Sequence, residues 1–366
     1  MATIAPTVLQ PLVIRGIISR LKVNNTRMQD FFGAGLDGGS AIETQSGRRF
    51  AYDIFDMSRE VAQGRLPGSP AKRIARHPVG NVTGTFPRVS EAVNLSGEEV
   101  HNMRRIGGPG AELDVNGSSF IQQQLGISKQ RVVNHREFQL WAMLRGSYTY
   151  NQDGDDVDTG FSGGGITIDF QVPAGNKSKL DMLGDGDIIA TAWDDAAAPI
   201  IGDLHAIHAA FESLCGLGLN HVWMNSTTWA FIVANTEVKA IAGTANRPFE
   251  VLTKTDDNDF TAVLAGAPWV TFHISNAVLN LDGTVTKMID DTHAIFCPTP
   301  DPSWISYLEG SEPVADGPNM PWVERFGAHF HAKMVDDPAG ADLHSVHNGI
   351  PMLKVPKAMA YGLIDY

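Results

Sequence analysis

Four prolines in the first quarter of the chain constrain its fold more than any other sequence feature. They are Pro67, Pro70, Pro78 and Pro87. They exclude a helix over this stretch and restrict the extended limbs around 49–56 and 79–89 to edge-type strands. At about 3.3 Å per residue, a limb of roughly 15–20 residues reaches about 50–65 Å. Because a lone two-stranded ribbon is marginal in water, we expect something outside the domain to cover this hairpin.

The charge of the chain is divided unevenly along its 366 residues, which carry a formal net charge of −13. Residues 1–110 carry 14 Lys and Arg against 9 Asp and Glu, whereas residues 111–366 carry 14 against 32. The basic segment is either an arm that binds nucleic acid or a segment that lies on the acidic surface of another copy. Because duplex DNA carries one negative charge per roughly 1.7 Å, an acidic chain should repel it outside local patches. We favour contact between copies.

Composition excludes several classes of protein. A hydrophobic share of 43% with 19% charged residues argues against wholesale disorder. The two cysteines, Cys215 and Cys297, are too few for a disulfide framework or a four-thiolate zinc site. No apolar run approaches the roughly 18 residues that a membrane-spanning helix needs. Prolines and arginines interrupt the apolar stretch 4–21, so we expect no signal peptide.

The periodicity of apolar residues predicts one long helix and two shorter ones. The long helix is expected from Ser119 to Arg145, with Ser119 and Gln122 as a capping box, a possible interruption at Gly126 and a stop at Gly146. The second helix is expected behind Asp203 as its N-cap, and ends at Gly216. The third is expected to have Ser226 as its N-cap and to continue through Val238. A short helical piece is also expected near Thr26–Phe32.

Strands are predicted in the remainder of the chain. The expected segments are a hairpin of 147–150 with 166–172, strands at 221–224 and 269–274, a hairpin around Asp282 and Gly283, a strand at 293–297, and tail strands at 325–334, 343–347 and 352–355. Residues 185–320 are expected to form a separate α/β unit in a chain whose overall class is α+β.

Candidate sites for chemistry are few, and the structural interpretation is favoured for each. His329 and His331 share one face of a strand, with His344 and His347 downstream, and could form half of the metal site of an enzyme. No Asp or Glu stands at a recognisable ligand spacing, so structural histidines are favoured. His205 and His208 lie on the second helix, where core packing or partial burial of His208 is expected.

Three further motifs fail in their details. The acidic run 153–158 has Gly154 at the second position and lacks a downstream Glu, so a solvated loop is favoured over a calcium loop. Gly33–Gly38 matches G-x-G-x-x-G but follows a helix and precedes none. Cys215 ends an apolar helical stripe, where an inert thiol is expected. No nucleophile elbow is expected, because the one G-x-S-x-G spacing, at 160–164, lies in the polar Asp/Gly loop of a predicted hairpin, and the sequence contains no phosphate loop.

The order of these elements, together with short local motifs, resembles a known family. The motifs are Lys129-Gln-Arg-Val-Val with Trp141-Ala-Met-Leu-Arg-Gly-Ser-Tyr-Thr, and Asp337-Pro-Ala with Pro351-Met-Leu and Pro356. The chain resembles the lambda-type (E-type) major capsid proteins of tailed bacteriophages, which have the Hong Kong 97-like fold. The resemblance implies an arm over 1–47, an extended β-hairpin loop over 48–100, and a peripheral domain with a spine helix over 101–184. It further implies an axial α/β domain over 185–324 and return strands over 325–366.

The resemblance also implies a function: self-assembly into pentamers and hexamers of an icosahedral shell that holds packaged double-stranded DNA. It implies no catalytic residue, cofactor, metal or membrane, and a virion location after assembly in the host cytoplasm. Portal, scaffold and decoration proteins are the implied partners. The alternatives are a metal-dependent enzyme that uses His329 and His331, and a bacterial compartment shell protein.

Seven residues are the candidate contacts between subunits: Phe50, Ile54, Phe55, Arg65, Lys72, Arg73 and Arg76. The apolar residues are expected to supply most of the contact energy and the basic ones its register, because an exposed ion pair contributes only about 0–1 kcal/mol. Some relatives form isopeptide bonds in the loop that contains Lys72. We further expect the first hundred residues to stay incompletely folded until other copies cover them.

Overall fold

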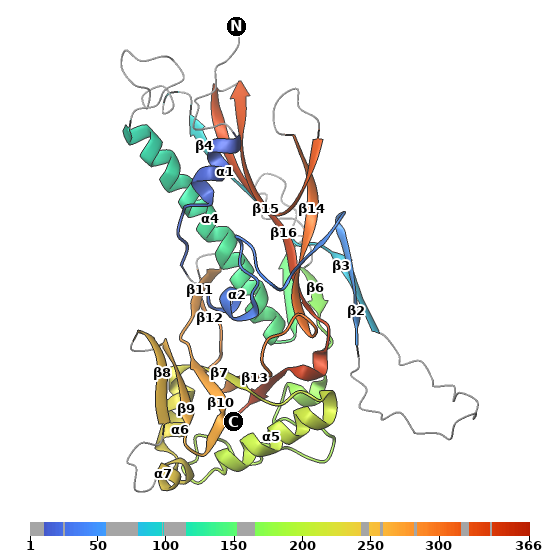
Figure 1. The fold of residues 1–366 in the computed structure, drawn as a ribbon, viewed down its shortest axis with the longest axis vertical. Helices are drawn as coiled ribbons and strands as arrows, with labels where there is room; N and C mark the ends of the chain where they lie inside the picture. Colours follow the sequence, from blue (N-terminus) through green and yellow to red (C-terminus); the bar gives the residue numbers. More distant parts are fainter. Residues whose placement is uncertain are drawn as a thin grey trace, which may run out of the picture. The chain divides into compact units, whose positions relative to one another are not determined.

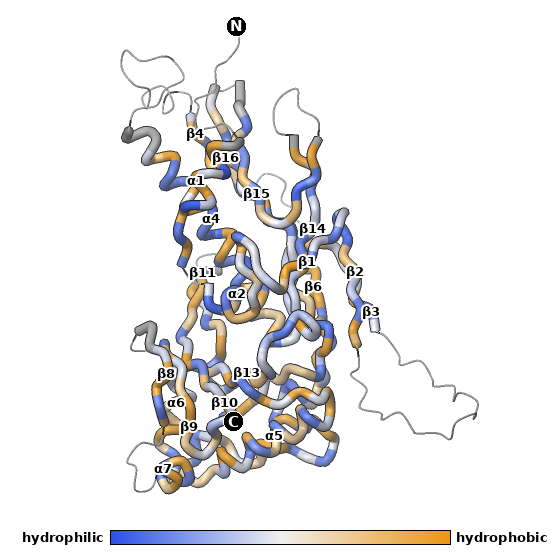
Figure 2. The backbone as a smooth tube through the Cα atoms, viewed as in Figure 1, coloured by the Kyte–Doolittle hydropathy of each residue, from blue (hydrophilic) through white to orange (hydrophobic). Residues whose placement is uncertain are grey.

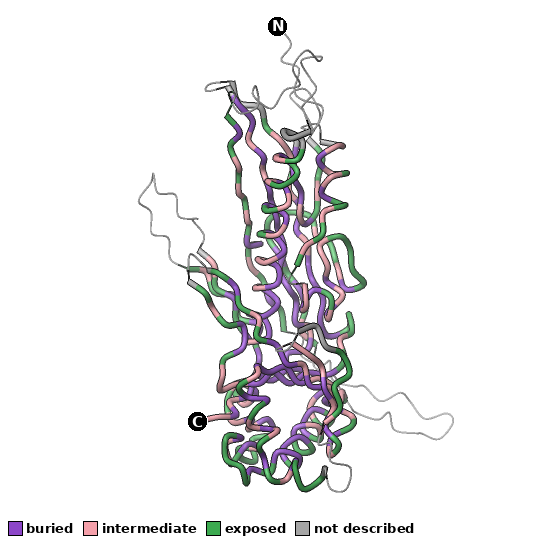
Figure 3. The backbone as a smooth tube through the Cα atoms, turned by 90° about the vertical axis from the view of Figure 1, so that its left-hand side faces the viewer, coloured by how far each residue is buried: buried purple, intermediate pink, exposed green. Residues whose placement is uncertain are grey.

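The computed structural model describes residues 11–24, 26–55, 80–96, 98, 115–151, 165–242, 249–256, 259–281, 284–315, 322–336 and 339–366 (Figure 1). The chain forms two compact units, each assembled from separate stretches. The first unit contains Met1–Phe50, Thr83–Leu140 and Ser306–Pro351, and the second contains Ala51–Val82, Trp141–Ile305 and Met352–Tyr366. Both units contain buried apolar residues, and Figure 3 shows how the buried positions are distributed along the backbone.

A five-stranded sheet in the order β1-β14-β15-β16-β4 organises the first unit. Its strands are β1 (Ile42–Gln45), β14 (Ile305–Ala315), β15 (Trp322–Asp336), β16 (Ala339–Leu353) and β4 (Arg88–Ser96). β14, β15, β16 and β4 pair antiparallel, whereas β1 runs parallel to β14. The helices α1 (Pro11–Ile18) and α4 (Val115–Leu144) cover one face, where Ile14, Leu125 and Phe330 share one core. An antiparallel sheet commonly packs one of its faces on the core and leaves the other in contact with water.

The tail strands are longer than expected. The segments 325–334 and 343–347 are confirmed as parts of β15 and β16. The separate strand expected at 352–355 is wrong, because Met352 and Leu353 are the last residues of β16.

The long helix α4 has 30 residues, which corresponds to about 45 Å. It begins four residues before Ser119, so the expected capping box there is wrong. Gly126 does not interrupt the helix, and the burial of neighbouring Ile121 and Leu125 offsets its cost of about 1 kcal/mol. The expected stop at Gly146 is confirmed, with a φ of 91° just after the helix. Hydrophobic and hydrophilic residues are mixed along α4, consistent with one covered face (Figure 2).

Two short helices lie in the N-terminal arm. The expected piece is confirmed as α2 (Arg27–Phe32), which ends at Gly33 with a φ of 63°. The second is α1, which was not expected, although Pro11 at its first position is a common start signal. The motif Gly33–Gly38 follows α2 and precedes strand β1, which reverses the strand–motif–helix order of dinucleotide sites.

The second unit contains a six-stranded sheet in the order β17-β13-β7-β10-β9-β8. Its strands are β17 (Ala360–Leu363), β13 (His293–Cys297), β7 (His221–Met224), β10 (Ala267–Ile274), β9 (Asp259–Leu264) and β8 (Phe249–Asp256). Only the pair β7–β10 is parallel among the described strands of this sheet. The expected strands at 221–224, 269–274 and 293–297 are confirmed, whereas β8, β9 and β17 were not expected.

The other elements of the second unit are three helices and two hairpins. They are α5 (Ile200–Cys215), α6 (Ser226–Ala234), α7 (Thr236–Ala242), β5 (Ser147–Asn151) with β6 (Gly165–Asp169), and β11 (Val278–Leu281) with β12 (Thr284–Lys287). Both hairpins confirm the prediction. Within the described residues, no helix is long and apolar enough to cross a membrane.

Two helix starts differ from expectation. α5 begins at Ile200, so Asp203 is not its N-cap but a buried first-turn residue that accepts a hydrogen bond from Trp193 Nε1 at 2.9 Å. Burial raises the pKa of Asp203 to about 6. The C-terminal stop at Gly216 is confirmed, with a φ of 73°.

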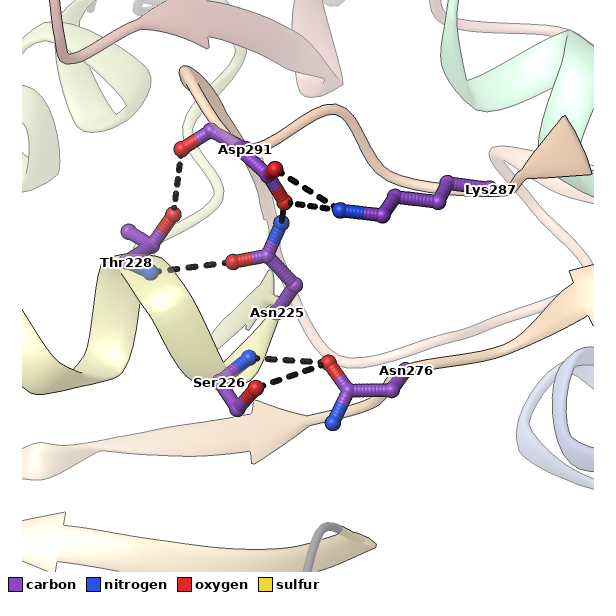
Figure 4. Close-up of polar contacts among 6 residues, drawn as sticks. All are labelled: Asn225, Ser226, Thr228, Asn276, Lys287 and Asp291. Atoms are coloured by element: carbon purple, nitrogen blue, oxygen red, sulfur yellow. Dashed lines mark hydrogen bonds and ion pairs between the residues drawn. The ribbon is translucent and has the colours of Figure 1, made fainter.

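The N-cap of α6 is Asn225, not Ser226: its side-chain oxygen accepts from the Thr228 N–H at 2.9 Å (Figure 4). Its Nδ2 donates to Asp291, whose carboxylate also pairs with Lys287 at 2.7 Å. Ser226 instead donates through its N–H and hydroxyl to Asn276. The helix expected through Val238 is divided at Asn235, which is extended, with a ψ of 141°.

Candidate subunit interface

The described part of the extended loop is a short hairpin. β2 (Arg49–Ile54) pairs with β3 (Gly80–Thr85) in a two-stranded sheet. The second limb is shorter than expected: β3 ends at Thr85, and after Pro87 the chain joins the five-stranded sheet as β4. A proline donates no backbone hydrogen bond, so it suits this point of transfer.

Two aromatic rings pack at the base of the hairpin. Phe50 is 1% exposed, and its ring centroid lies 5.5 Å from that of Phe86. Each ring also covers a glycine, because a Cβ on Gly84 would lie 2.7 Å from Phe50 Cζ, and one on Gly310 would lie 2.7 Å from Phe86 Cδ2. Both glycines are therefore needed for this packing. Phe50 belongs to the core of its own subunit.

Phe55 presents its side chain to solvent. It is 48% exposed, and its backbone N–H donates to the Lys354 carbonyl at 2.8 Å. Ile54 is half-buried, and its Cβ lies close to Gly80. Of the three apolar candidates, Phe55 therefore offers the largest surface to a partner. The four basic candidates, Arg65, Lys72, Arg73 and Arg76, lie outside the described residues.

Lys129 on α4 holds the N-terminal arm at the end of α1. Its buried ammonium donates to the Ile18 carbonyl at 2.9 Å, the Leu21 carbonyl at 3.2 Å and the Asp37 carboxylate at 2.9 Å. A cation at the carbonyl end of a helix is favourable because it satisfies unpaired acceptors and the helix dipole.

Glu137, two turns further along α4, holds the start of α2. Its carboxylate accepts from the Met28 N–H at 2.8 Å and from the Gln29 N–H at 3.3 Å. Burial raises the pKa of Glu137 to about 7, although these hydrogen bonds act in the opposite direction. The sequence analysis did not predict that Lys129 and Glu137 bind the arm. The signal that could have indicated this role was a pair of charged residues eight positions apart in a predicted amphipathic helix.

The expectation that the first hundred residues need other copies in order to fold is wrong for much of that segment. Ile14, Met28 and Phe32 of the arm are buried within the chain, as are Phe86 and Leu95. β1 and β4 are also paired in the five-stranded sheet. Local propensity could not reveal these partners, because they lie some 100–270 residues away in sequence.

A buried polar network joins α4 to the five-stranded sheet. Arg136 donates to Glu309 at 2.8 Å, and its guanidinium lies 3.9 Å from the centroid of the Tyr307 ring. The Tyr307 hydroxyl donates to Gln139 and lies 2.9 Å from His347 Nε2. Arg136 is completely buried, so the network fixes the helix on the sheet through groups that have lost their water.

The histidines of β15 and β16 form a row on the sheet. His331 lies opposite His344 in the register, with ring centroids 5.1 Å apart, and His329 stacks on His331 at 5.8 Å. Within the described residues, no three His, Cys, Asp or Glu side chains are arranged to hold a metal ion. Burial, followed by the neighbouring His331, lowers the pKa of His329 to about 4. Burial also lowers the pKa of His344 and His347.

The lowered pKa values of these histidines predict that they destabilise the fold in acid. The unfolded chain takes up protons below its ordinary histidine pKa of about 6.5, whereas folded His329 stays neutral until about pH 4. The contribution of His329 to stability should therefore fall as the pH decreases from about 6.5 to 4, by about 1–2 kcal/mol at pH 5. Urea unfolding at neutral and acidic pH measures this loss. His329→Phe, which keeps a ring, should reduce it, and an identical loss in this variant would contradict the prediction.

The remaining candidates occupy ordinary structural positions. His208 is half-buried on α5, as expected, with Nδ1 3.3 Å from the Leu219 carbonyl, whereas His205 is exposed and lies against Trp269. Cys215 is buried, and its thiol donates to the Phe211 carbonyl. The acidic loop lies outside the described residues except for its flanking strands.

Comparison with known proteins adds a family and a fold. The family model described as phage major capsid protein E matches residues 18–362. No curated protein matches the chain in sequence. The solved structure of the putative capsid protein of a prophage of E. coli CFT073 is similar, with a TM-score of 0.56 and 12% identity over 97% of this chain and 99% of that one.

Two further solved structures match with lower scores. A phage-related protein from Bordetella bronchiseptica RB50 has a TM-score of 0.47 and 10% identity over 97% of this chain and 96% of that one. The capsid protein of cyanophage Pam1 has a TM-score of 0.45 and 10% identity over 93% and 92%.

Proposed function

Because the chain belongs to the phage major capsid protein E family and has the Hong Kong 97-like fold expected from its sequence, we propose that it assembles through pentamers and hexamers into an icosahedral shell around double-stranded DNA. Its role is that of a major capsid protein, the structural component of a bacteriophage head. The family match over residues 18–362 is the observation that carries this conclusion.

The proposal also assigns each part of the chain to a domain of the subunit. In this proposal the extended loop within 48–100 contacts the next subunit. The unit with the five-stranded sheet, which includes the arm 1–47 and β14, is the peripheral domain, and the unit with the six-stranded sheet, which includes β17, is the axial domain. Rings of subunits require heterologous contacts, in which one face meets a different face of the next copy. A loop with excess positive charge and an acidic remainder of the chain supply two such unlike faces.

We place assembly in the host cytoplasm, with a portal at one vertex and with scaffold and decoration proteins as further partners. Phe55 supports the loop contact. Its aromatic ring is exposed just after the end of β2, and the chain that follows contains the basic residues of the loop. Aromatic residues are enriched in the energetically important parts of interfaces.

Negative-stain electron microscopy of the expressed protein tests the proposal. Closed shells, tubes or capsomer rings are the expected result. A protein that stays monomeric at every concentration and salt condition, with or without co-expressed phage scaffold, would contradict it.

Charge reversal in the loop is a second test. Replacing Arg65, Lys72, Arg73 and Arg76 by Glu should prevent assembly, because four attractive contacts with an acidic neighbour become repulsive. The subunit should stay folded, which circular dichroism and the urea midpoint can verify. The control reverses Lys239 and Lys333, which are exposed basic residues outside the loop. Normal shells from the loop variant would show that the basic loop is not a contact.

A further inference from the structure

The turn that follows α4 brings two cations together. Arg145 comes directly after the helix, and Gly146, with a φ of 91°, leads the chain into β5. A Cβ on Gly146 would lie 2.6 Å from Lys177 Cε and 2.9 Å from Lys177 Nζ. The end of the Lys177 side chain therefore rests on the main chain of Gly146, next to Arg145. All three residues belong to the second unit.

Neither cation has a carboxylate partner in the chain. Among the described residues, the side chains of Arg145 and Lys177 form no ion pair and donate no hydrogen bond. Two carboxylates of the same unit have other partners: Asp169 accepts from a main-chain N–H at 2.9 Å, and Asp290 accepts from the Tyr361 hydroxyl at 2.8 Å. Buried polar groups normally have partners, so these two cations require an explanation.

Arg145 presents the edge of its guanidinium that is suited to oxyanions. This edge carries Nε and Nη2, and in Arg145 both atoms are buried without a hydrogen-bond partner. Two other arginines of the chain use the same two atoms to bind a carboxylate. Arg88 donates to Glu312 at 2.8 to 3.1 Å, and Arg131 donates to Glu91 at 2.6 and 2.7 Å. Arg145 offers the same fork, with no acceptor from the chain.

The missing counter-charge distinguishes Arg145 from buried Arg136. Arg136 also leaves Nε and Nη2 unpaired, but its Nη1 donates to Glu309 at 2.8 Å, so its charge is compensated. The Arg145 guanidinium acts on Tyr361 at longer range: burial and the hydrogen bond to Asp290 raise the pKa of Tyr361, and the charge of Arg145 opposes this rise. The carbonyl end of α4 favours a nearby cation, but the Arg145 side chain donates to none of its carbonyls.

We propose that Arg145 and Lys177 bind a small inorganic oxyanion of the phosphate type, with the guanidinium fork as the directional ligand and the ammonium as the second charge. The fork lies below the surface, although Arg145 as a whole is only half-buried. A free ion reaches the fork after a small movement of the arginine side chain. A carboxylate on another copy is held back by its own backbone, so we favour the free ion. This site goes beyond the proposed function, because a single subunit contains all of it.

Calorimetric titration of inorganic phosphate into dilute, unassembled protein in chloride buffer tests the site. We expect one phosphate per subunit, with competition from sulfate, which has the same tetrahedral oxygens. Arg145→Gln should weaken binding at least tenfold, because it removes both the charge and the fork. Arg145→Lys keeps the charge but not the fork, so it should also weaken binding. Absence of saturable binding to the wild-type protein would overturn the proposal.

Lys179 provides the matched control for Lys177. It carries the same charge two residues away, but its ammonium lies 3.3 Å from the centroid of the Tyr366 ring. Lys177→Gln should weaken phosphate binding about fivefold, whereas Lys179→Gln should leave it unchanged. Equal effects of the two variants would mean that phosphate responds only to the net charge of the protein, and the site would be wrong.

Urea unfolding in phosphate and in chloride of equal ionic strength gives a second measurement. Above the dissociation constant, each tenfold increase in phosphate should raise the folding equilibrium constant about tenfold. Arg145→Gln should remove this dependence, and circular dichroism verifies that the variants are folded. Loss of assembly in Arg145→Gln, without phosphate binding by the wild-type protein, would assign the fork to a carboxylate of a neighbouring copy and overturn the proposal. Failure of the wild-type protein to form shells would count against the proposed function alone, because phosphate binding is measured on the subunit.

Discussion

Replacing Arg136 by methionine should lower the free energy of unfolding by about 3–5 kcal/mol, the usual cost of breaking a buried ion pair by removing one partner. The arginine side chain is fully buried and that of Glu309 is only 13% exposed, so the carboxylate would be left largely without water or a cation. The variant also loses the contact between the guanidinium and the Tyr307 ring. Urea unfolding followed by circular dichroism measures the change.

Two further variants isolate the cause. Arg131→Met removes an arginine from the same helix, but Arg131 and Glu91 are 65% and 34% exposed, so a loss of only about 0–1 kcal/mol is expected. The double variant Arg136→Met with Glu309→Leu should recover most of the stability, because no buried charge remains unpaired. If Arg136→Met costs no more than Arg131→Met, the network does not hold the helix on the sheet.

Local sequence signals were sufficient for most elements of the second unit. Gly216 and Gly146 ended their helices as expected, since both adopt the left-handed backbone that glycine tolerates. The hairpins β5–β6 and β11–β12 also follow from local alternation and turn residues. Helix starts were less predictable: Asn225 and Ser226 are both good caps, and in the folded chain Asn225 caps α6 while its amide nitrogen donates to the distant Asp291.

Pairings between distant segments could not be derived in the same way. β1 pairs with β14 across more than 260 residues. The register is parallel, and a strand of four residues is too short to specify it by its own sequence. Lys129 and Glu137 were visible as charges, but their partners are main-chain groups of the arm. Main-chain groups carry no sequence signature, so only the folded chain identifies them.

The sequence indicated a group of residues for the candidate interface, but not which of them are exposed to a partner. Phe50 and Phe55 were grouped because both are aromatic residues of one extended limb. Strand geometry separates them, since residues at even and odd positions of a strand point to opposite faces. The burial pattern of β2 follows this rule, with Phe50 and Tyr52 buried between exposed neighbours. An alternation test on 49–55 would have assigned Phe50 to the core.

This separation leads to a paired prediction for folding and assembly. Phe50→Ala should lower the free energy of unfolding by about 3–5 kcal/mol, because it leaves a cavity against Phe86 and Gly84. Phe55→Ala should change it by less than about 0.5 kcal/mol, because its ring is 48% exposed in the subunit. Urea unfolding of the unassembled protein measures both values.

Assembly should respond to Phe55 even though folding does not. If its ring enters a pocket on the next subunit, Phe55→Ala should raise the concentration needed for assembly at least tenfold, equivalent to about 1.4 kcal/mol per contact. Phe55→Leu keeps apolar area and should restore part of the loss, whereas Val285→Ala removes a 68% exposed apolar residue elsewhere and serves as the matched control. Light scattering against protein concentration gives the threshold for each variant. An unchanged threshold for Phe55→Ala would mean that the end of β2 does not contact the neighbouring subunit, and the loop contact would then depend on the basic residues alone.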